Sequence, residues 1–295
     1  MCKTKSAYLF PGITNISNMR DSVHKVLTQW LKPYNYSLSE LLSKDVLACI
    51  SNKSYHELND FDRQVIGYTA SCAVYDAYIK RRGLADYISG YSMGIFGALY
   101  AARSISFMTG ISLLHSLDKV IEKSFGPDDK FSMATVIGLS RMQLRKVIEE
   151  RGGIDIVNQN SELSLVVSGW KNEVDLLEDK AFKAGAVLFK QLPIERPYHS
   201  SLLLKCRDEW MGILGKEAIG NPRTPVISPT TAGIFADRKG CIAELENNFC
   251  NSFYWLDVLK VFWEIGVRHM YECGASRDLA RIGKYSGFAH QYHEF

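Results

Sequence analysis

The N-terminal part of the chain combines two short apolar runs with several longer segments whose apolar side chains recur at helical spacing. The short runs, residues 7–10 and 86–89, predict strands, and Pro11 and Gly12 end the first of them. The longer segments predict helices, the third of which ends at Gly83, a residue that commonly caps helix C-termini. These segments are residues 18–30, 38–50, 61–82, 96–102 and 107–121.

The predicted helices and strands become shorter after residues 126–129, which read Gly-Pro-Asp-Asp. The order of predicted elements that follows, β-α-β-β-α-β over about 60 residues, is typical of a ferredoxin-like fold. We therefore predict an inserted small subdomain at residues 128–197, between the two parts of a large domain at 1–127 and 198–295. The strands are expected at 131–139, 154–158, 163–168 and 187–192, around an Asn-rich turn, and the helices at 141–150 and 172–184.

Longer helical segments return in the C-terminal part. Because strands alternate with helices on both sides of the insert, we expect an α/β fold with a mainly parallel sheet in the large domain. His290 and His293 lie in the last six residues, which we expect to be mobile. The predicted helices are residues 200–214, 242–249, 254–265 and 276–284, and the predicted strands are 225–228 and 269–272.

Residues 90–94, Gly-Tyr-Ser-Met-Gly, read G-x-S-x-G between a predicted strand and a predicted helix. This pattern places a serine on a sharp strand-to-helix turn, because glycines without a Cβ let the backbone turn tightly beside it. Ser92 would then lie at a helix N-terminus and at the C-terminal end of a parallel strand, where open α/β sheets place their sites. The alternative is a Gly-Ser turn without a chemical role.

A serine nucleophile needs a base, because its hydroxyl is barely ionised at neutral pH. Among the seven histidines, context favours His199, which lies in a loop between the predicted small subdomain and a helix, where a side chain can face a cleft. His115 and His269 neighbour apolar stripes, and a histidine packed in the core is the commoner explanation there.

Composition and charge exclude several classes of function. The 295 residues are 46% hydrophobic and carry a net charge of +3 from dispersed basic residues, which argues against nucleic-acid binding. Seven scattered cysteines without a C-x-x-C pair argue for free thiols, so we expect neither disulfides nor a metal site. Because no apolar run has membrane-spanning length and no signal peptide is recognisable, we expect a cytoplasmic protein.

Five segments, in order and at matching spacing, resemble the malonyl-CoA:acyl-carrier-protein transacylases and the acyltransferase domains of polyketide synthases. Residues 9–12 (Leu-Phe-Pro-Gly) resemble the opening F-P-G-Q-G-S-Q motif of that family, and residues 90–94 resemble its G-H-S-L-G motif. Residues 166–169 (Val-Val-Ser-Gly), 198–200 (Tyr-His-Ser) and 272–274 (Glu-Cys-Gly) resemble its V-I-S-G, F-H-S and E-V-G-P motifs. The resemblance covers nearly the whole chain.

The resemblance implies an α/β-hydrolase-like large domain, a ferredoxin-like small subdomain and ping-pong chemistry on thioesters. Ser92 would attack the thioester carbonyl, and His199 would take the proton and return it to the leaving thiol. Backbone N–H groups of Met93 and Ile13 would form the oxyanion hole, and a backbone carbonyl near Asn248 would orient the histidine. The family uses no metal or tightly held cofactor, and its acyl groups arrive on the phosphopantetheine arm of coenzyme A or an acyl carrier protein.

The chain departs from the family around the predicted acyl pocket. Ile13 stands in place of the glutamine after F-P-G, and Tyr91 in place of the histidine before the serine. Ile95 stands in place of an acidic residue after the turn at residues 90–94, which we call the elbow. Aligning the next helix without gaps places Leu117 where the family has its malonate-binding arginine. The sequence motifs remain, but the polar groups that would receive a free carboxylate do not.

The loss of that arginine bears directly on the substrate. A buried carboxylate left unpaired costs about 2–5 kcal/mol or more, and no arginine lies between Arg103 and Arg141. Lys119 is two positions from Leu117 and points off that helix face. We therefore predict that the acyl group lacks a terminal carboxylate, and that Leu117, Tyr91, Tyr198 and Ile95 contribute to an apolar acyl pocket.

Three functions remain open at the level of sequence. The first is a transferase that moves an acyl group between coenzyme A or carrier-protein thioesters in polyketide or fatty-acid-type biosynthesis. The second is a hydrolase that clears stalled acyl groups from carriers, since both reactions need Ser92 and His199. The third, a non-catalytic docking protein, is disfavoured because both residues are retained.

We expect a monomer whose partner is an acyl carrier protein. Asn160 and Ser161 could border the cleft, and Arg196 could contact a phosphate or a carrier.

Overall fold

Alternating side chains along the first strand define the two faces of the main sheet. In the computed structural model, which describes residues 4–13, 16–52, 58–148 and 153–295, Tyr8 and Phe10 of β1 (Lys5–Phe10) pack into one apolar cluster. Ala7 and Leu9 pack into another on the opposite face. This alternation follows from the two-residue period of a strand, and burial on both faces is typical of a parallel sheet.

The main sheet has six strands and is parallel throughout except at one edge, where β7 and β8 pair antiparallel. This confirms the predicted mainly parallel sheet. The strand order is β10 (Gln291–His293), β9 (Val267–Glu272), β1, β2 (Tyr87–Gly90), β7 (Val226–Ile227) and β8 (Ile234–Phe235).

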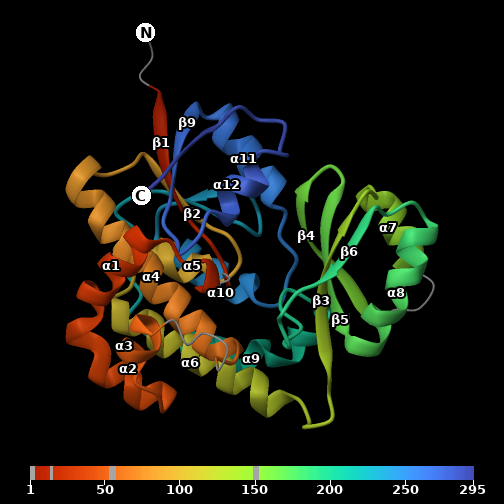
Figure 1. Ribbon diagram of the computed structural model, residues 1–295, viewed down its shortest axis with the longest axis horizontal. Coiled ribbons are helices and arrows are strands. Elements are labelled where there is room, and N and C mark those ends of the chain that lie inside the picture. Colours follow the sequence, from red (N-terminus) through yellow and green to blue (C-terminus); the bar gives the residue numbers. More distant parts are fainter. Residues whose placement is uncertain (1–3, 14–15, 53–57, 149–152) are drawn as a thin grey trace.

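Helices cover both faces of this sheet, as the alternating sequence pattern predicts (Figure 1). The cluster that contains Tyr8 and Phe10 includes α1 (Asp21–Leu31), α4 (Asp60–Arg82), α5 (Gly94–Ala101) and α6 (Phe107–Ser124). The cluster that contains Ala7 and Leu9 includes α11 (Trp255–Glu264) and α12 (Asp278–Gly283). No helix in the described part of the chain is long and apolar enough to cross a membrane.

The second sheet lies beside the first and is entirely antiparallel (Figure 1). Its strand order, β4 (Ile154–Ser161), β5 (Ser164–Trp170), β3 (Phe131–Ile137) and β6 (Leu188–Gln191), confirms the ferredoxin-like arrangement. Its helices, α7 (Arg141–Ile148) and α8 (Lys171–Lys183), pack on one face of the sheet. The predicted end of the first helix, at residues 149–150, lies outside the described residues, and the domain boundaries at 127/128 and 197/198 stay a prediction.

Two predicted helices are divided in the structure. Residues 38–50 were expected to form one helix, but α2 (Asn35–Leu42) ends at Ser43, whose φ of +52° is left-handed, and α3 (Val46–Ser51) starts anew after Asp45. The side chain of Asp45 accepts a hydrogen bond from Ala48 N, which caps α3. Residues 200–214 likewise divide into a 3₁₀ helix, η4 (Ser201–Cys206), and α9 (Arg207–Leu214).

The prediction of a mobile C-terminus is wrong. Residues 291–293 form β10 and pair with β9, and His293 stacks on Tyr271 with ring centroids 4.7 Å apart. His290 is buried beside Trp263. A three-residue strand is too short to leave a periodic signal in the sequence. The remaining elements are η1 (Ile16–Asn18), η2 (Lys32–Tyr34) and α10 (Arg238–Asn248).

Candidate active site

Ser92 lies on a strained turn between β2 and α5, as the G-x-S-x-G pattern predicts. Its φ of +55° is in the left-handed region, which non-glycine residues rarely adopt and which costs about 1–3 kcal/mol. The flanking glycines permit this turn because a Cβ on Gly94 would lie 2.0 Å from the carbonyl oxygen of Phe10, and one on Gly90 would lie 2.3 Å from Gly94. Tyr91 N also donates to Phe10 O at 2.8 Å, which ties the turn to β1.

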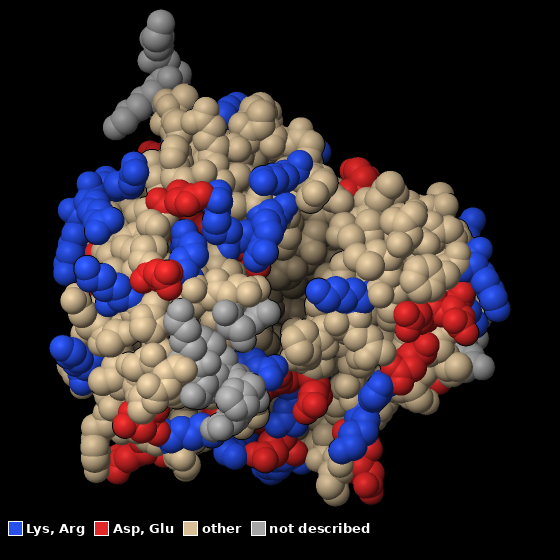
Figure 2. All heavy atoms as spheres, in the orientation of Figure 1, with Lys and Arg blue, Asp and Glu red and all other residues tan. Residues whose placement is uncertain are grey.

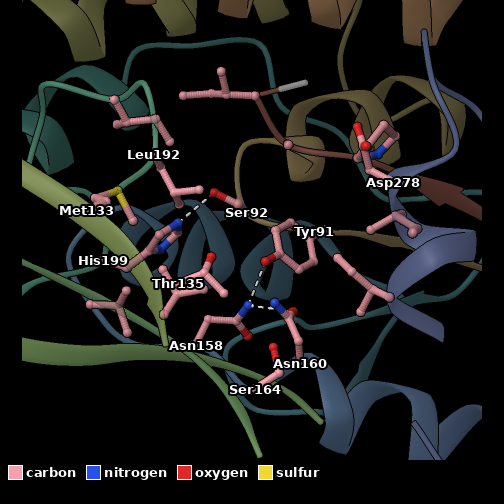
Figure 3. A pocket seen from close by; sticks show the side chains of 18 of the residues that line it. Tyr91, Ser92, Met133, Thr135, Asn158, Asn160, Ser164, Leu192, His199 and Asp278 are labelled. Atoms are coloured by element: carbon pink, nitrogen blue, oxygen red, sulfur yellow. Dashed lines mark hydrogen bonds between the residues drawn. The ribbon is translucent and has the colours of Figure 1, made fainter. Parts of the chain in front are cut away.

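His199 approaches Ser92 from the loop after the small sheet. The Oγ of Ser92 and the Nε2 of His199 are 2.6 Å apart (Figure 3). His199 also has a left-handed φ, +64°, and its backbone N–H donates to Phe249 O at 2.8 Å. Two strained residues that meet at hydrogen-bonding distance are typical of a nucleophile and its base.

Burial keeps the imidazole neutral. It lowers the pKa of His199 from 6.5 to about 4, while the backbone carbonyls of Asn248 and Asn251 act in the opposite direction. Nδ1 is buried and forms no hydrogen bond of ordinary geometry with the described residues. The neutral tautomer with its proton on Nδ1, facing those carbonyls, leaves Nε2 free to accept the Ser92 proton. The prediction that Asn248 lies at the base is therefore consistent with the geometry.

The two predicted oxyanion donors flank the nucleophile. Met93 follows Ser92 and is the N-terminal cap residue of α5, where backbone N–H groups point outward. A Cβ on Gly12 would lie 3.1 Å from the Cβ of Ser92, so the loop that carries Ile13 passes against the serine. Both N–H groups are thus near the place where an oxyanion would form, and their role stays a prediction.

A cleft of about 1200 Å³ runs between the two sheets and reaches Ser92 and His199. Figure 2 shows it as a hollow with mostly uncharged walls. The small sheet contributes the face not covered by its helices, because Met133, Thr135 and Ile137 alternate with the buried Ala134 and Val136 along β3. Further lining residues are Ile13, Ile16, Tyr91, Val166, Leu192, Ile194, Tyr198 and Leu279.

The structure does not bring Leu117 and Ile95 to the cleft surface. Both are buried in the core of the large domain, and neither is among the described lining residues. Leu114, one helical turn before Leu117, lines a separate cavity of about 10 Å³ together with Ile13 and Met93. Ile13, Tyr91 and Tyr198 line the cleft, whereas Leu117 and Ile95 complete the apolar packing behind it.

Sequence reasoning missed a polar network opposite the nucleophile. Asn158 Nδ2 donates to the hydroxyl of Tyr91 at 2.6 Å and to Oδ1 of Asn160 at 2.8 Å (Figure 3). Burial raises the pKa of Tyr91 to about 12, so the phenol stays protonated. Asn158 was expected to end the strand at 154–158, but β4 continues to Ser161, and the buried amide of Asn158 was not foreseen. Asn160 and Ser161 line the cleft as expected.

Tyr198 lies beside the base and is hydrogen-bonded to a buried amide. Its hydroxyl accepts a hydrogen bond of 2.7 Å from Nε2 of the buried Gln64, and burial raises its pKa. Arg196 is not among the described cleft residues and instead pairs with Asp118 at 3.4 Å. In the part of the chain that the structure describes, no group of three or more His, Cys, Asp or Glu residues is arranged to hold a metal.

The cations that line the described part of the cleft are Arg63, Lys190 and Arg281. Arg63 donates to Pro193 O at 3.1 Å and lies 3.5 Å from Asp60. Arg281 pairs with Asp278, and Lys190 is exposed on the edge strand β6. None of them extends from α6, the helix on which an arginine would be expected from the resemblance.

Known proteins provide an independent comparison of the whole chain. The malonyl CoA-acyl carrier protein transacylase of Escherichia coli is 26% identical over 291 residues, which cover 95% of this chain and 92% of that one. Over nearly its whole length the chain is similar to the malonyl-CoA:acyl-carrier-protein transacylases. The polyketide biosynthesis malonyl CoA-acyl carrier protein transacylase BaeC of Bacillus velezensis is 25% identical and covers 93% of this chain and 94% of that one. No protein-family model matches the chain.

Several solved structures share the fold. An acyl-carrier-protein S-malonyltransferase from Burkholderia pseudomallei superposes with a TM-score of 0.85 at 24% identity and covers 98% of this chain and 95% of that one. A malonyl transacylase in complex with its type II polyketide synthase acyl carrier protein gives a TM-score of 0.88 at 24% identity, and the match covers 99% and 96% of the chains. The large α/β-hydrolase-like unit with a ferredoxin-like one is thus the fold of this chain.

Proposed function

We propose that this protein is a serine acyltransferase that moves an acyl group between thioesters of coenzyme A or an acyl carrier protein through an acyl-Ser92 intermediate. The observation that carries the proposal is the 2.6 Å contact between Ser92 Oγ and His199 Nε2 at a large, mostly apolar cleft. The names of the homologues, acyl carrier protein transacylases of fatty acid and polyketide synthesis, support the same class of reaction.

In the first half-reaction, Ser92 Oγ attacks the carbonyl carbon of the thioester while its proton passes to Nε2 of His199. The N–H groups of Met93 and Ile13 stabilise the resulting oxyanion. When the C–S bond breaks, the thiolate takes the proton back from His199 and leaves as the free thiol. In the second half-reaction, the thiol of the acceptor carrier attacks the acyl-serine by the reverse path, which regenerates Ser92.

We infer that the acyl group carries no terminal carboxylate. An arginine on α6 would form two parallel hydrogen bonds with the carboxylate of malonate, but Leu117 stands at that place and is buried among apolar side chains. The cleft cations Arg63 and Arg281 are paired with Asp60 and Asp278. Lys190, the remaining cation among the described lining residues, is exposed on the edge strand β6. A carboxylate buried beside Ser92 would therefore lose its water without gaining an arginine that binds both of its oxygens.

Hydrolysis is the second candidate function, because a cleft of about 1200 Å³ leaves room for water beside a short acyl group. Transfer and hydrolysis share the acyl-enzyme and differ only in the nucleophile that takes the acyl group from it. A monomer that meets carrier proteins in the cytoplasm fits either reaction.

The protein should be mixed with malonyl, acetyl, hexanoyl and branched acyl-carrier thioesters and with free carrier, and followed by intact-mass spectrometry. Acyl-Ser92 followed by acylated acceptor supports the transferase. Free acid without acylated acceptor, abolished by Ser92→Ala, identifies the hydrolase. Absence of acyl-Ser92 with every thioester, or turnover that survives in Ser92→Ala, would contradict the proposed function.

A further inference from the structure

Glu244 is a buried carboxylate that the proposed mechanism does not use. It lies on α10 with only 3% of its surface exposed, and burial raises its pKa. A carboxylate in such a place is costly unless hydrogen bonds satisfy its oxygens. Its partners therefore indicate why the chain retains it.

Both carboxylate oxygens of Glu244 are bonded. The hydroxyls of Ser228 and Thr230 donate to Oε2, the second over 2.8 Å. Nδ2 of Asn248 donates to Oε1 over 3.0 Å. One side chain thus joins the loop after β7 to the last turn of α10.

The first anchor belongs to the strands that carry the nucleophile. Ser228 directly follows β7, and β7 pairs with β2, the strand that leads into Ser92. Ser89 of β2 also donates from its hydroxyl to Ile227 O at 2.8 Å. The loop that holds Glu244 is therefore fixed to the scaffold of the elbow.

The second anchor belongs to the segment that faces the base. Asn248 is the last residue of α10, and its backbone carbonyl, with that of Asn251, faces the imidazole of His199. The next residue, Phe249, accepts the backbone N–H of His199 at 2.8 Å. Any displacement of this turn would move the two carbonyls that the imidazole of His199 faces.

We propose that Glu244 is a positioning residue for His199: it holds Asn248, and with it the carbonyls at the end of α10, at a fixed place relative to Ser92. This inference rests on the proposed function of the Ser92–His199 pair. It concerns how the base is oriented and adds no group that contacts the substrate.

The test compares three variants by the rate at which a fluorophosphonate probe labels Ser92 across pH. Glu244→Leu keeps the volume but removes the hydrogen bonds, and it should slow labelling about ten- to a hundredfold. It should also lower the pH midpoint, because the carbonyls raise the pKa of His199. In Glu244→Gln the amide oxygen can accept from Ser228 and Thr230, and its NH2 group can donate to Oδ1 of Asn248 once that amide turns over. This variant should therefore label close to the rate of the unchanged protein.

Glu246→Leu is the matched control, because Glu246 lies on the same helix and pairs with Arg207 at the surface. It should leave the labelling rate and the midpoint unchanged. Labelling of Glu244→Leu at the unchanged rate and midpoint would overturn the inference, as would a Glu244→Gln variant as slow as Glu244→Leu or a control that slows equally.

Asn248→Ala removes the hydrogen bond between Asn248 and Glu244 from the other side. It replaces Glu244→Leu in the test if that variant does not fold. It should slow labelling, and adding Glu244→Leu or Glu244→Gln to it should cause no further loss, because the two residues act as one unit. Independent, additive losses would overturn the inference. If the probe labels Ser92 but no thioester is turned over, the proposed function is wrong while the inference about Glu244 still stands. Failure of the one can therefore be distinguished from failure of the other.

Discussion

The buried position of His199 predicts that Ser92 stays reactive well below neutral pH. With a pKa of about 4, the imidazole remains neutral and able to accept the Ser92 proton at pH 5.5 in about 97% of molecules. With the ordinary value of 6.5 this fraction would be about 9%. The labelling rate of Ser92 at pH 5.5 should therefore be within a few per cent of its plateau, about tenfold above the rate for an exposed histidine.

The assay follows fluorophosphonate labelling of Ser92 by intact mass between pH 3.5 and 8, with Ser92→Ala and His199→Ala as controls. The titration of Glu272 must be distinguished from that of His199, because burial raises the pKa of Glu272 to about 7. Its carboxylate also accepts the N–H groups of Leu279 and Ala280 at the cleft wall, so its protonation could affect the cleft. The variant Glu272→Gln removes that titration. A midpoint near pH 6.5 that persists in Glu272→Gln would refute the reasoning.

The same pKa shift affects stability. Because the folded-state pKa lies below the unfolded value, the unfolded chain binds the proton first, and stability is lost as pH falls from 6.5 towards 4. A shift of this size corresponds to about 3 kcal/mol. Burial lowers the pKa of His290 to about 4 as well, so it contributes with the same sign.

Three substitutions test the packing around the site. Gly94→Ala should abolish Ser92 labelling and lower the melting temperature, because its Cβ would lie 2.0 Å from Phe10 O; labelling at the normal rate would contradict this. Tyr198→Phe should cost about 1–3 kcal/mol in urea unfolding, because it leaves Nε2 of Gln64 buried without an acceptor; an unchanged midpoint would count against that hydrogen bond. Leu117→Arg should destabilise by about 3–5 kcal/mol through its buried charge, and malonyl-carrier assays should show no gain in malonyl loading.

Local patterns were sufficient for the architecture, and together with the resemblance they singled out Ser92 and His199, whose side chains are in contact in the structure. The elbow is determined by glycines whose tight contacts come from neighbouring segments, so the motif itself predicts the position of Ser92. The position of His199 at a junction between two folding patterns favoured it, and the resemblance of residues 198–200 to the F-H-S motif assigned it as the base. Both predictions depend on the order of residues and elements along the chain, which can be read directly from the sequence.

The parts that failed depend on contacts between distant segments. Asn158 was predicted only as the last residue of a strand, yet its amide donates to the hydroxyl of Tyr91, 67 positions away on the turn after β2. Nothing in the sequence indicated a role for Glu244, because Ser228 and Thr230 come together with Asn248 around it only in the fold. The position of Leu117 behind the cleft wall, and not on it, likewise depends on how α6 packs.

The central claim is tested most directly by competition between two acyl groups for Ser92. The protein would be mixed with equal amounts of malonyl-carrier and hexanoyl-carrier, with Ser92→Ala as control, and the acyl-enzyme resolved by intact mass. We expect hexanoyl-Ser92 in excess, because the cleft is apolar and Leu117 provides no partner for a carboxylate. Malonyl-Ser92 in excess would contradict it.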